Sequence, residues 1–440
     1  MAAPAPAATQ TLPGAKFFAP QARLVTQDGQ PLLVGNQSID QDLMSVTVTQ
    51  PCTGVGQVEI TLNNQRFGSP NPRTPPWKYN GLKQAELAFG TRLRVDLRYG
   101  QDPWTPMMLV RVTNAGFAFP SAAGATVTVT GEDMLSLLRT KPTKPVKHRK
   151  VKEFKIVEDE LKASGSGLTV FLPAPSDLFS SPLAELTHEP SQSYLQFIQS
   201  LAERMDYEVY VGFDKPGDPF TGEAASKTGA KSVINADVKL HFSPARSAVL
   251  GNPIPLAWGL DIVEFKPTFK IWDILTEAKV TGGLPRARGR CDPPEPIKMD
   301  DAIKGDLHPA PGQSAPISAI EARKRALETE AGSAKTRVGP EIEANVATVE
   351  VKNLDTERAT RQGIAALRKS AREFLTAEIT TIGYARLRPG IHVNLTGFYA
   401  PFDGIYYITQ AVHTLSSAGY TTKISVRRPG MLDPSGYPGG

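Results

Sequence analysis

Two stretches that lie far apart in the chain carry the same pattern, and this repeat constrains the fold more than any other feature. Residues 91–113 can be placed on residues 389–411 without a gap, so that Val95 falls on Val393. The match continues through a connecting loop and, after a one-residue slip, into a further strand: Pro103-Trp104 falls on Pro401-Phe402, Val127 on Ile424 and Val129 on Val426. Internal similarity of this kind is typical of a duplicated structural unit. We therefore expect two similar small β-barrel (tube) domains in one chain.

The first copy contains the clearest strand, over residues 92–99, where apolar and polar side chains alternate. One face carries Leu93, Val95, Leu97 and Tyr99, and the other carries Arg92, Arg94, Asp96 and Arg98. Strict alternation predicts a strand with one face in a core and the other toward water or a partner. The sequence therefore predicts that these arginines face outward.

Between the two copies, the pattern changes to mixed helix and strand. The basic stretch 141–150 contains Pro142 and Pro145, which oppose regular structure, and we interpret it as a domain boundary and solvated linker. Ser193 can cap a helix whose apolar residues recur at helical spacing, and an alternating strand begins at Tyr207. Another helix, capped by Asp355, precedes the last three strands.

These patterns predict a mainly β protein with an α+β insertion, divided into six regions. We expect a flexible N-terminus, a first β-barrel domain, an α+β domain, a second β-barrel domain in two pieces, an extended insertion within it, and a flexible tail. Their predicted bounds are, in that order, 1–20, 21–140, 141–255, 256–284 with 351–428, 285–350 and 429–440. The insertion is rich in Pro, Ala and charge and has few large apolar residues, so it cannot build a core alone.

Composition excludes several classes of protein. The chain has 440 residues and a net charge of +5, and its 49 cations are nearly balanced by 44 anions, which argues against a dedicated nucleic-acid binder. No apolar run is long enough to span a membrane, and the N-terminus lacks the pattern of a signal peptide. Cys52 and Cys291 stand alone, so neither a disulfide framework nor a thiolate metal site is expected.

The order of these short motifs resembles the late-control protein D family, the baseplate hub proteins of contractile-tailed phages, which is related to the hub part of VgrG. The motifs are Val127-Thr128-Val129-Thr130-Gly131-Glu132-Asp133, the helix 194–203, the strand 207–211, Leu387-Arg388-Pro389-Gly390, Phe402-Asp403-Gly404-Ile405-Tyr406-Tyr407-Ile408, His413, Gly419-Tyr420-Thr421-Thr422 and Arg427-Arg428. Each motif is weak, but their order covers most of residues 20 to 428. Residues 285–350 do not match the pattern.

The resemblance implies a function based on geometry. Family hubs are trimers in which each chain contributes two barrels, so that the ring is pseudo-sixfold and adapts a hexameric tail tube to a trimeric central spike. The implied partners are the chain itself as a homotrimer, a spike protein, a tail tube or tube-initiator protein and other baseplate proteins. The chain ends after the last hub strands, so we expect the spike to be a separate protein. We expect synthesis in the host cytoplasm and assembly into the baseplate of a phage, a tail-derived bacteriocin or another injection system.

The repeat suggests where partners bind. The outward positions of the two copies differ, as expected if one side of the ring meets a threefold spike. The predicted interface residues are Arg92, Arg94, Arg98, Trp104, His392, Thr396 and Phe402.

No motif in the chain predicts catalysis, a cofactor or a metal. His188-Glu189-Pro190-Ser191-Gln192 resembles a zinc-protease helix, but Gln192 stands where the second ligand must be, and Pro190 opposes a helix. Gly312-Gln313-Ser314-Ala315-Pro316 lacks the last glycine of a nucleophile elbow. Two other hypotheses stay open: a baseplate-associated peptidoglycan hydrolase that uses carboxylates such as Glu203 and Asp206, and a DNA-binding module that uses the cations of 141–155. We interpret His413 as a structural residue.

Overall fold

The computed structural model describes residues 19–27, 29–34, 37–65, 77–79, 87–100, 102–121, 124–171, 183–213, 238–244, 253–270, 277–283, 297–298, 346–352, 356–398 and 402–428. The predicted N-terminal region up to residue 18, the tail from residue 429, Cys291 and the motif at 312–316 lie outside these residues. Most of the predicted insertion does so as well.

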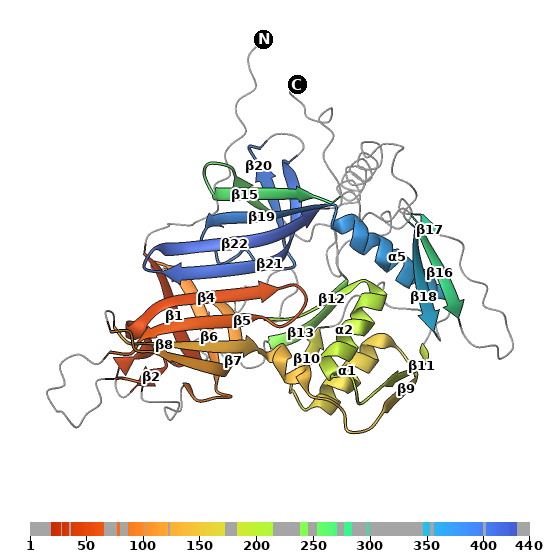
Figure 1. Ribbon diagram of the computed structural model, residues 1–440, viewed down its shortest axis with the longest axis horizontal. Helices are drawn as coiled ribbons and strands as arrows, with labels where there is room; N and C mark the ends of the chain where they lie inside the picture. Colours follow the sequence, from red (N-terminus) through yellow and green to blue (C-terminus); the bar gives the residue numbers. More distant parts are fainter. Residues whose placement is uncertain are drawn as a thin grey trace, which may run out of the picture.

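A single antiparallel sheet dominates the molecule (Figure 1). Its main path runs β1-β6-β7-β8-β5-β4-β21-β22-β19-β15, and β20 and β14 extend it beside β21. The strands of the first half are β1 (Pro20–Thr26), β4 (Leu43–Pro51), β5 (Gln57–Asn63), β6 (Arg92–Tyr99), β7 (Thr105–Ala118) and β8 (Thr126–Asp133). Those of the second half are β14 (Ile254–Ala257), β15 (Ile262–Phe269), β19 (Leu375–Ile382), β20 (His392–Thr396), β21 (Gly404–Ser416) and β22 (Gly419–Arg428).

The two halves repeat one strand order, which confirms the predicted duplication. In the first half the neighbours run β4-β5-β8-β7-β6-β1, and in the second they run β15-β19-β22-β21-β20-β14. The order along the chain is also the same. We call residues 20–133 without the loops between strands the first unit, and the six later strands the second unit. One pairing differs, because β1 is antiparallel to β6 whereas β14 is parallel to β20.

Local irregularities show which residues of the two units are equivalent. A bulge at Thr113 in β7 matches one at Thr409 in β21, and a bulge at Met44 in β4 matches one at Val263 in β15. Gly90 and Gly390, with φ of 85° and 86°, precede β6 and β20 and donate to the carbonyls of Val112 and Ile408. These features place Leu93 on Val393, Val95 on Leu395, and Val129 on Ile424.

The gapless alignment of the sequences is therefore wrong by two residues in each of these strands. The error is invisible in the pattern, because a shift of two residues leaves every side chain on the same face of its strand. The Pro-aromatic pairs are not equivalent either. Trp104 stacks on the arginines of the first unit, whereas Phe402 packs against Phe265 and Phe269, and Pro401 lies outside the described residues.

Each unit encloses its own apolar core. Inward residues of β4, β5, β6, β7 and β8, such as Val48, Ile60 and Val95, form the first. Leu375, Val393, Leu395 and Ile424 belong to the second. Two short strands, β2 (Leu33–Val34) and β3 (Gln37–Ser38), and the 3-10 helix η1 (Ile39–Asp42) cover one end of the first unit.

The α+β domain follows β8 and the 3-10 helix η3 (Met134–Arg139). Its helices are α1 (Glu153–Ser164) and α2 (Tyr194–Met205), and its strands are β9 (Val146–Val151), β10 (Thr169–Phe171), β11 (Leu183–His188), β12 (Tyr207–Phe213) and β13 (Val238–Pro244). The predicted cap is confirmed, since the Ser193 hydroxyl accepts from the Gln196 N–H and the Gln196 side chain returns to Ser193. Residues 146–151, predicted as linker, instead form β9 and pair with β11.

The helix α5 (Thr356–Arg372) lies against α2 and against a separate sheet of β16 (Glu277–Gly283), β17 (Ile297–Lys298) and β18 (Val346–Lys352) (Figure 1). Its buried face includes Leu367 and Ala371, as predicted, whereas Asp355 lies outside the described residues. Neither β16 nor β18 joins the sheet of the second unit.

Buried ion pairs connect the α+β domain to its neighbours. Arg358 of α5 binds Glu153 of α1, and Arg372 of α5 places two nitrogens 2.6 Å from the Asp206 carboxylate. Glu208 of β12 accepts from the Tyr407 hydroxyl and, at 2.7 Å, from Arg427. Because removal of one partner leaves a buried charge uncompensated, such pairs fix the relative positions of the elements that they join.

We predict that Glu208→Gln lowers the free energy of unfolding by about 3 kcal/mol, because it leaves the largely buried Arg427 guanidinium without its anion. Chemical denaturation followed by circular dichroism measures this. Glu203→Gln, the same change at an exposed position on α2, should alter stability by less than about 0.5 kcal/mol. Equal effects of the two substitutions would contradict the role given to Glu208.

His413 of β21 is fully buried, as expected of a structural residue. Its Nε2 donates to the Leu387 carbonyl at 2.9 Å, and its Nδ1 lies 2.9 Å from the Tyr420 hydroxyl and 3.1 Å from that of Thr422. Desolvation, with help from the nearby Arg388 charge, lowers the pKa of His413 to about 3. The folded state therefore holds this imidazole neutral at pH values where the unfolded chain protonates it.

We predict a loss of stability on acidification that depends on His413. Its contribution is complete above the ordinary histidine pKa and is lost as the pH falls from that value toward the folded pKa. Between about pH 7.5 and about pH 5, His413 should account for about 2 kcal/mol of lost stability. The difference in unfolding free energy between these pH values should shrink by that amount in His413→Gln. An unchanged difference would show that His413 does not cause the dependence.

Candidate interaction surface

The centre of the polar face of β6, predicted to point outward, is buried. Asp96 is completely buried and lies 2.6 Å from Arg94 and 2.7 Å from Arg23 of β1. Arg94 is only 2% exposed, and the turn after β1 approaches it: a Cβ added at Gly29 would lie 3.7 Å from its guanidinium group. The prediction of an exposed Arg94 is therefore wrong for the single chain: Arg94 neutralises Asp96 inside the first unit.

The other predicted interface residues lie in varied surroundings. The Trp104 ring lies between the guanidinium groups of Arg23 and Arg98, whose carbons are 4.5 and 4.1 Å from its centroid. His392 is buried against Tyr407. Exposure therefore divides the set into three groups: Arg92 and Thr396 are exposed, Arg98, Trp104 and Phe402 are half-buried, and Arg94 and His392 are buried. A contact with a partner at the exposed and half-buried positions stays a prediction.

Sequence reasoning missed two groups of exposed apolar side chains on strand edges. At the end of β7, Phe117 is 38% exposed and Phe119 is 54% exposed. The other group surrounds β14 and β15 and comprises Trp258, Leu260, Val263 and Phe269. Gathered apolar exposure of this kind marks surfaces that bind other proteins. Alternation within a strand predicts which residues share a face but not whether anything covers it.

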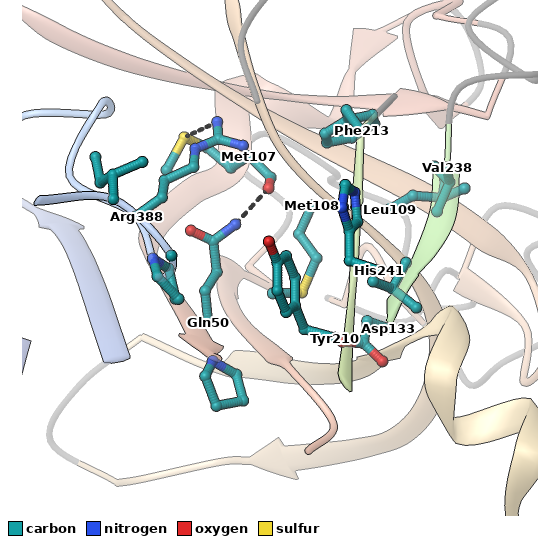
Figure 2. A pocket seen from close by; sticks show the side chains of 16 residues that line it. Gln50, Met107, Met108, Leu109, Asp133, Tyr210, Phe213, Val238, His241 and Arg388 are labelled. Atoms are coloured by element: carbon teal, nitrogen blue, oxygen red, sulfur yellow. Dashed lines mark hydrogen bonds between the residues drawn. The ribbon is translucent and has the colours of Figure 1, made fainter. Parts of the chain in front are cut away.

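The junction between the two units and the α+β domain encloses a small cavity (Figure 2). Gln50 of β4 donates to the Met107 carbonyl at 2.7 Å, and Arg388 donates to the Pro106 carbonyl and contacts the Met107 sulfur. Tyr210 and His241 close the other side, with their rings stacked at 4.8 Å. The volume is about 60 Å³, far below the roughly 300 Å³ of small ligand pockets. The cavity is therefore a packing junction.

A larger groove of about 590 Å³ runs between α2, α5 and the second unit. Side chains of both charge signs line it, among them Glu203, Asp206, Lys369, Glu373 and Glu378. Asp206 is held by Arg372 through both of its oxygens, and Glu203 lies exposed on α2. The pair proposed for acid/base catalysis therefore has one carboxylate fixed in an ion pair, which disfavours a proton-transfer role.

A buried cluster in the α+β domain explains His188. The Glu160 carboxylate lies 2.6 Å from His148 Nε2 and 2.8 Å from His188 Nδ1, and the second nitrogen of His188 lies 3.0 Å from the Gln192 carbonyl. His188 ends the strand β11 and does not lie on a helix. Both of its nitrogens have protein partners, so the cluster stabilises the domain rather than presenting a ligand site.

The remaining candidates for chemistry behave as ordinary structural groups. Cys52 is buried, and burial raises the pKa of its thiol, which disfavours the reactive thiolate. Arg149 pairs with Glu185, and Lys155 pairs with Glu158 and Asp159, so these cations of the basic stretch have anionic neighbours. Within the described ranges, no group of His, Cys, Asp and Glu has the arrangement of a metal site. No helix in the same ranges is long and apolar enough to cross a membrane.

Comparison with known proteins identifies the fold. No protein-family profile and no curated protein matches this chain. Among solved structures, the 43 kDa tail protein of prophage MuSo2 from Shewanella oneidensis has a TM-score of 0.57 and 14% identity, over 94% of this chain and 100% of that one. The tail protein from Neisseria meningitidis MC58 also has a TM-score of 0.57, with 11% identity over 96% of this chain and 100% of that one. A Francisella PdpA–VgrG complex, with a TM-score of 0.47, 10% identity and coverage of 95% and 58%, is too distant to carry an argument. The chain therefore has the fold of these two tail proteins over nearly its whole length.

Proposed function

We propose that this protein is the hub of a contractile tail baseplate, a trimeric adaptor between a hexameric tail tube, or its initiator protein, and a trimeric central spike. The observation that carries the proposal is the repetition of one six-strand order within a single chain. The fold shared with two tail proteins, one of them from a prophage, supports a structural place in a tail or a related injection particle. The protein would then be made in the host cytoplasm and reside in the baseplate with other baseplate proteins.

The repetition supports an adaptor for a reason of symmetry. A hexameric tube end presents six equivalent surfaces, and a trimer can meet all six only if each chain offers two similar faces. Faces without a match would leave strand edges and apolar side chains in water, which favours aggregation. A chain with two similar units satisfies this requirement, and the differences between the units leave room for a threefold partner on the other side.

A structural role also agrees with the described titratable groups. Asp206, His188 and His413 each have their polar atoms committed to protein partners, and the cavity at the domain junction is too small for a substrate. No observation favours the hydrolase or the DNA-binding hypothesis over the hub. We therefore propose that the protein is not an enzyme.

The proposal predicts a trimer, formed by the isolated protein or together with its spike. Light scattering coupled to size-exclusion chromatography should give three times the chain mass of 47.5 kDa, with one spike trimer added in the complex. A stable dimer or hexamer in both samples would exclude the adaptor function.

A further inference from the structure

The first and second units of the chain meet along one ladder of hydrogen bonds between β4 and β21. The outer edge of β4 pairs with the second half of β21, in antiparallel register from Gln410 opposite Pro51 to Leu415 opposite Val46. The first half of the same edge of β21 pairs with β20. This ladder makes one sheet of the two units, with β4 as the joining strand of the first and β21 as that of the second.

The equivalents of these two edges have no partner strand within the described ranges. β15 is equivalent to β4, and its inner edge pairs with β19. β7 is equivalent to β21, and β6 covers its edge only as far as Arg111, followed by a bond from Val112 to Thr91. β15 ends the path of strands on one side, and β7 lies near the other end, third after β1 and β6 (Figure 1).

Apolar side chains along the two unpaired edges are more exposed than their equivalents beside the internal ladder. Phe117 is 38% exposed, whereas its equivalent in β21, His413, is 0% exposed under β4. On the other edge, Phe265 and Pro267 are half-buried, whereas their equivalents in β4, Val46 and Val48, are fully buried, and Phe269 is 37% exposed. The two unpaired edges therefore carry the apolar surface that the internal ladder buries.

The matched bulges determine the register of such a pairing. They place β21 on β7 with Thr409 at Thr113, and β4 on β15 with Met44 at Val263. Transfer of the internal register then sets Gly116 opposite Thr268. The complete set of facing pairs is Asn114 with Lys270, Ala115 with Phe269, Gly116 with Thr268, Phe117 with Pro267, Ala118 with Lys266, and Phe119 with Phe265.

This register separates apolar from polar pairs. The pairs of Phe117 with Pro267, Phe119 with Phe265 and Ala115 with Phe269 share one face, and the pairs that include Lys266, Thr268 and Lys270 share the other. An aromatic cross-strand pair such as Phe119 with Phe265 stabilises a sheet. Pro267 has no N–H and cannot donate to the new ladder. Edge strands tolerate proline, and the missing donor discourages unspecific pairing.

We propose that β15 of one copy of this chain forms an antiparallel ladder with residues 114–119 of a second copy, in the register given above. The contact is heterologous, because each chain uses β15 toward one neighbour and β7 toward the other. Three chains then close a ring with six similar junctions, three within chains and three between them. This inference rests on the hub function proposed above and names the surface through which the copies meet.

Disulfide trapping tests the register in the full chain. In a Cys52→Ala/Cys291→Ala background, Gly116→Cys is made in one chain and Thr268→Cys in another chain that carries a size tag. A Cβ at Gly116 meets nothing within 4 Å, and Thr268 is exposed, so both changes should be tolerated. On mild oxidation we expect a covalent dimer of the two chains in the mixture and none with either variant alone.

The matched control combines Gly116→Cys with Lys270→Cys, which shifts the pair by two residues on the same face. That diagonal separates the Cα atoms by about 7–8 Å, beyond the usual range for a disulfide. A trimer by light scattering without the 116–268 crosslink, or with equal crosslinking in the control, would overturn the ladder and leave the hub intact. The crosslink in open oligomers, without a trimer, would support the ladder and contradict the ring. If neither a trimer nor a crosslink forms, with or without the spike, both the ladder and the hub function are overturned.

Discussion

The ladder between β4 and β21 is the interaction on which the rest of the architecture depends. It joins two units of the same strand order into one sheet, so that the chain has one long hydrogen-bonded path instead of two separate small domains. An antiparallel ladder fixes direction and register together, because a slip of one residue would turn every side chain to the other face. The second unit is thereby placed relative to the first by hydrogen bonds of the backbone.

The α+β domain adds a second constraint on this arrangement. Glu208 links β12 to β21 and β22 of the second unit, and Asp206 and Glu153 link α2 and α1 to α5. These pairs are largely buried, so their geometry is specific even where their net stabilisation is small. The small cavity where Gln50, Met107 and Arg388 meet shows that the three parts pack closely. Within the described ranges, β15 and the part of β7 beyond Arg111 are among the strands whose edges this packing leaves without a partner strand.

Much of the fold could be predicted from the sequence, because alternation in strands and helical spacing in 194–205 report directly on burial. The duplication was predicted and the strand order confirms it, but its alignment was wrong by two residues, since a period of two cannot detect a shift of two. The burial of Arg94 could not be predicted, because it depends on Arg23 and Asp96, which lie on different strands. The open apolar edges at Phe117 and Phe269 also escaped prediction. Sequence shows which residues share a face, whereas only topology shows which strand lacks a neighbour.

The central claim is that one chain provides two equivalent positions in a ring of six. The most direct test is a cryo-electron microscopy map of the assembled protein, from which the junction between chains can be superimposed on the junction between β4 and β21. We predict six similar sheet units around a threefold axis, with β15 and β7 of neighbouring chains paired in the register of the internal ladder. A ring in which the two units lie at different radii, or in which other surfaces join the copies, would contradict it.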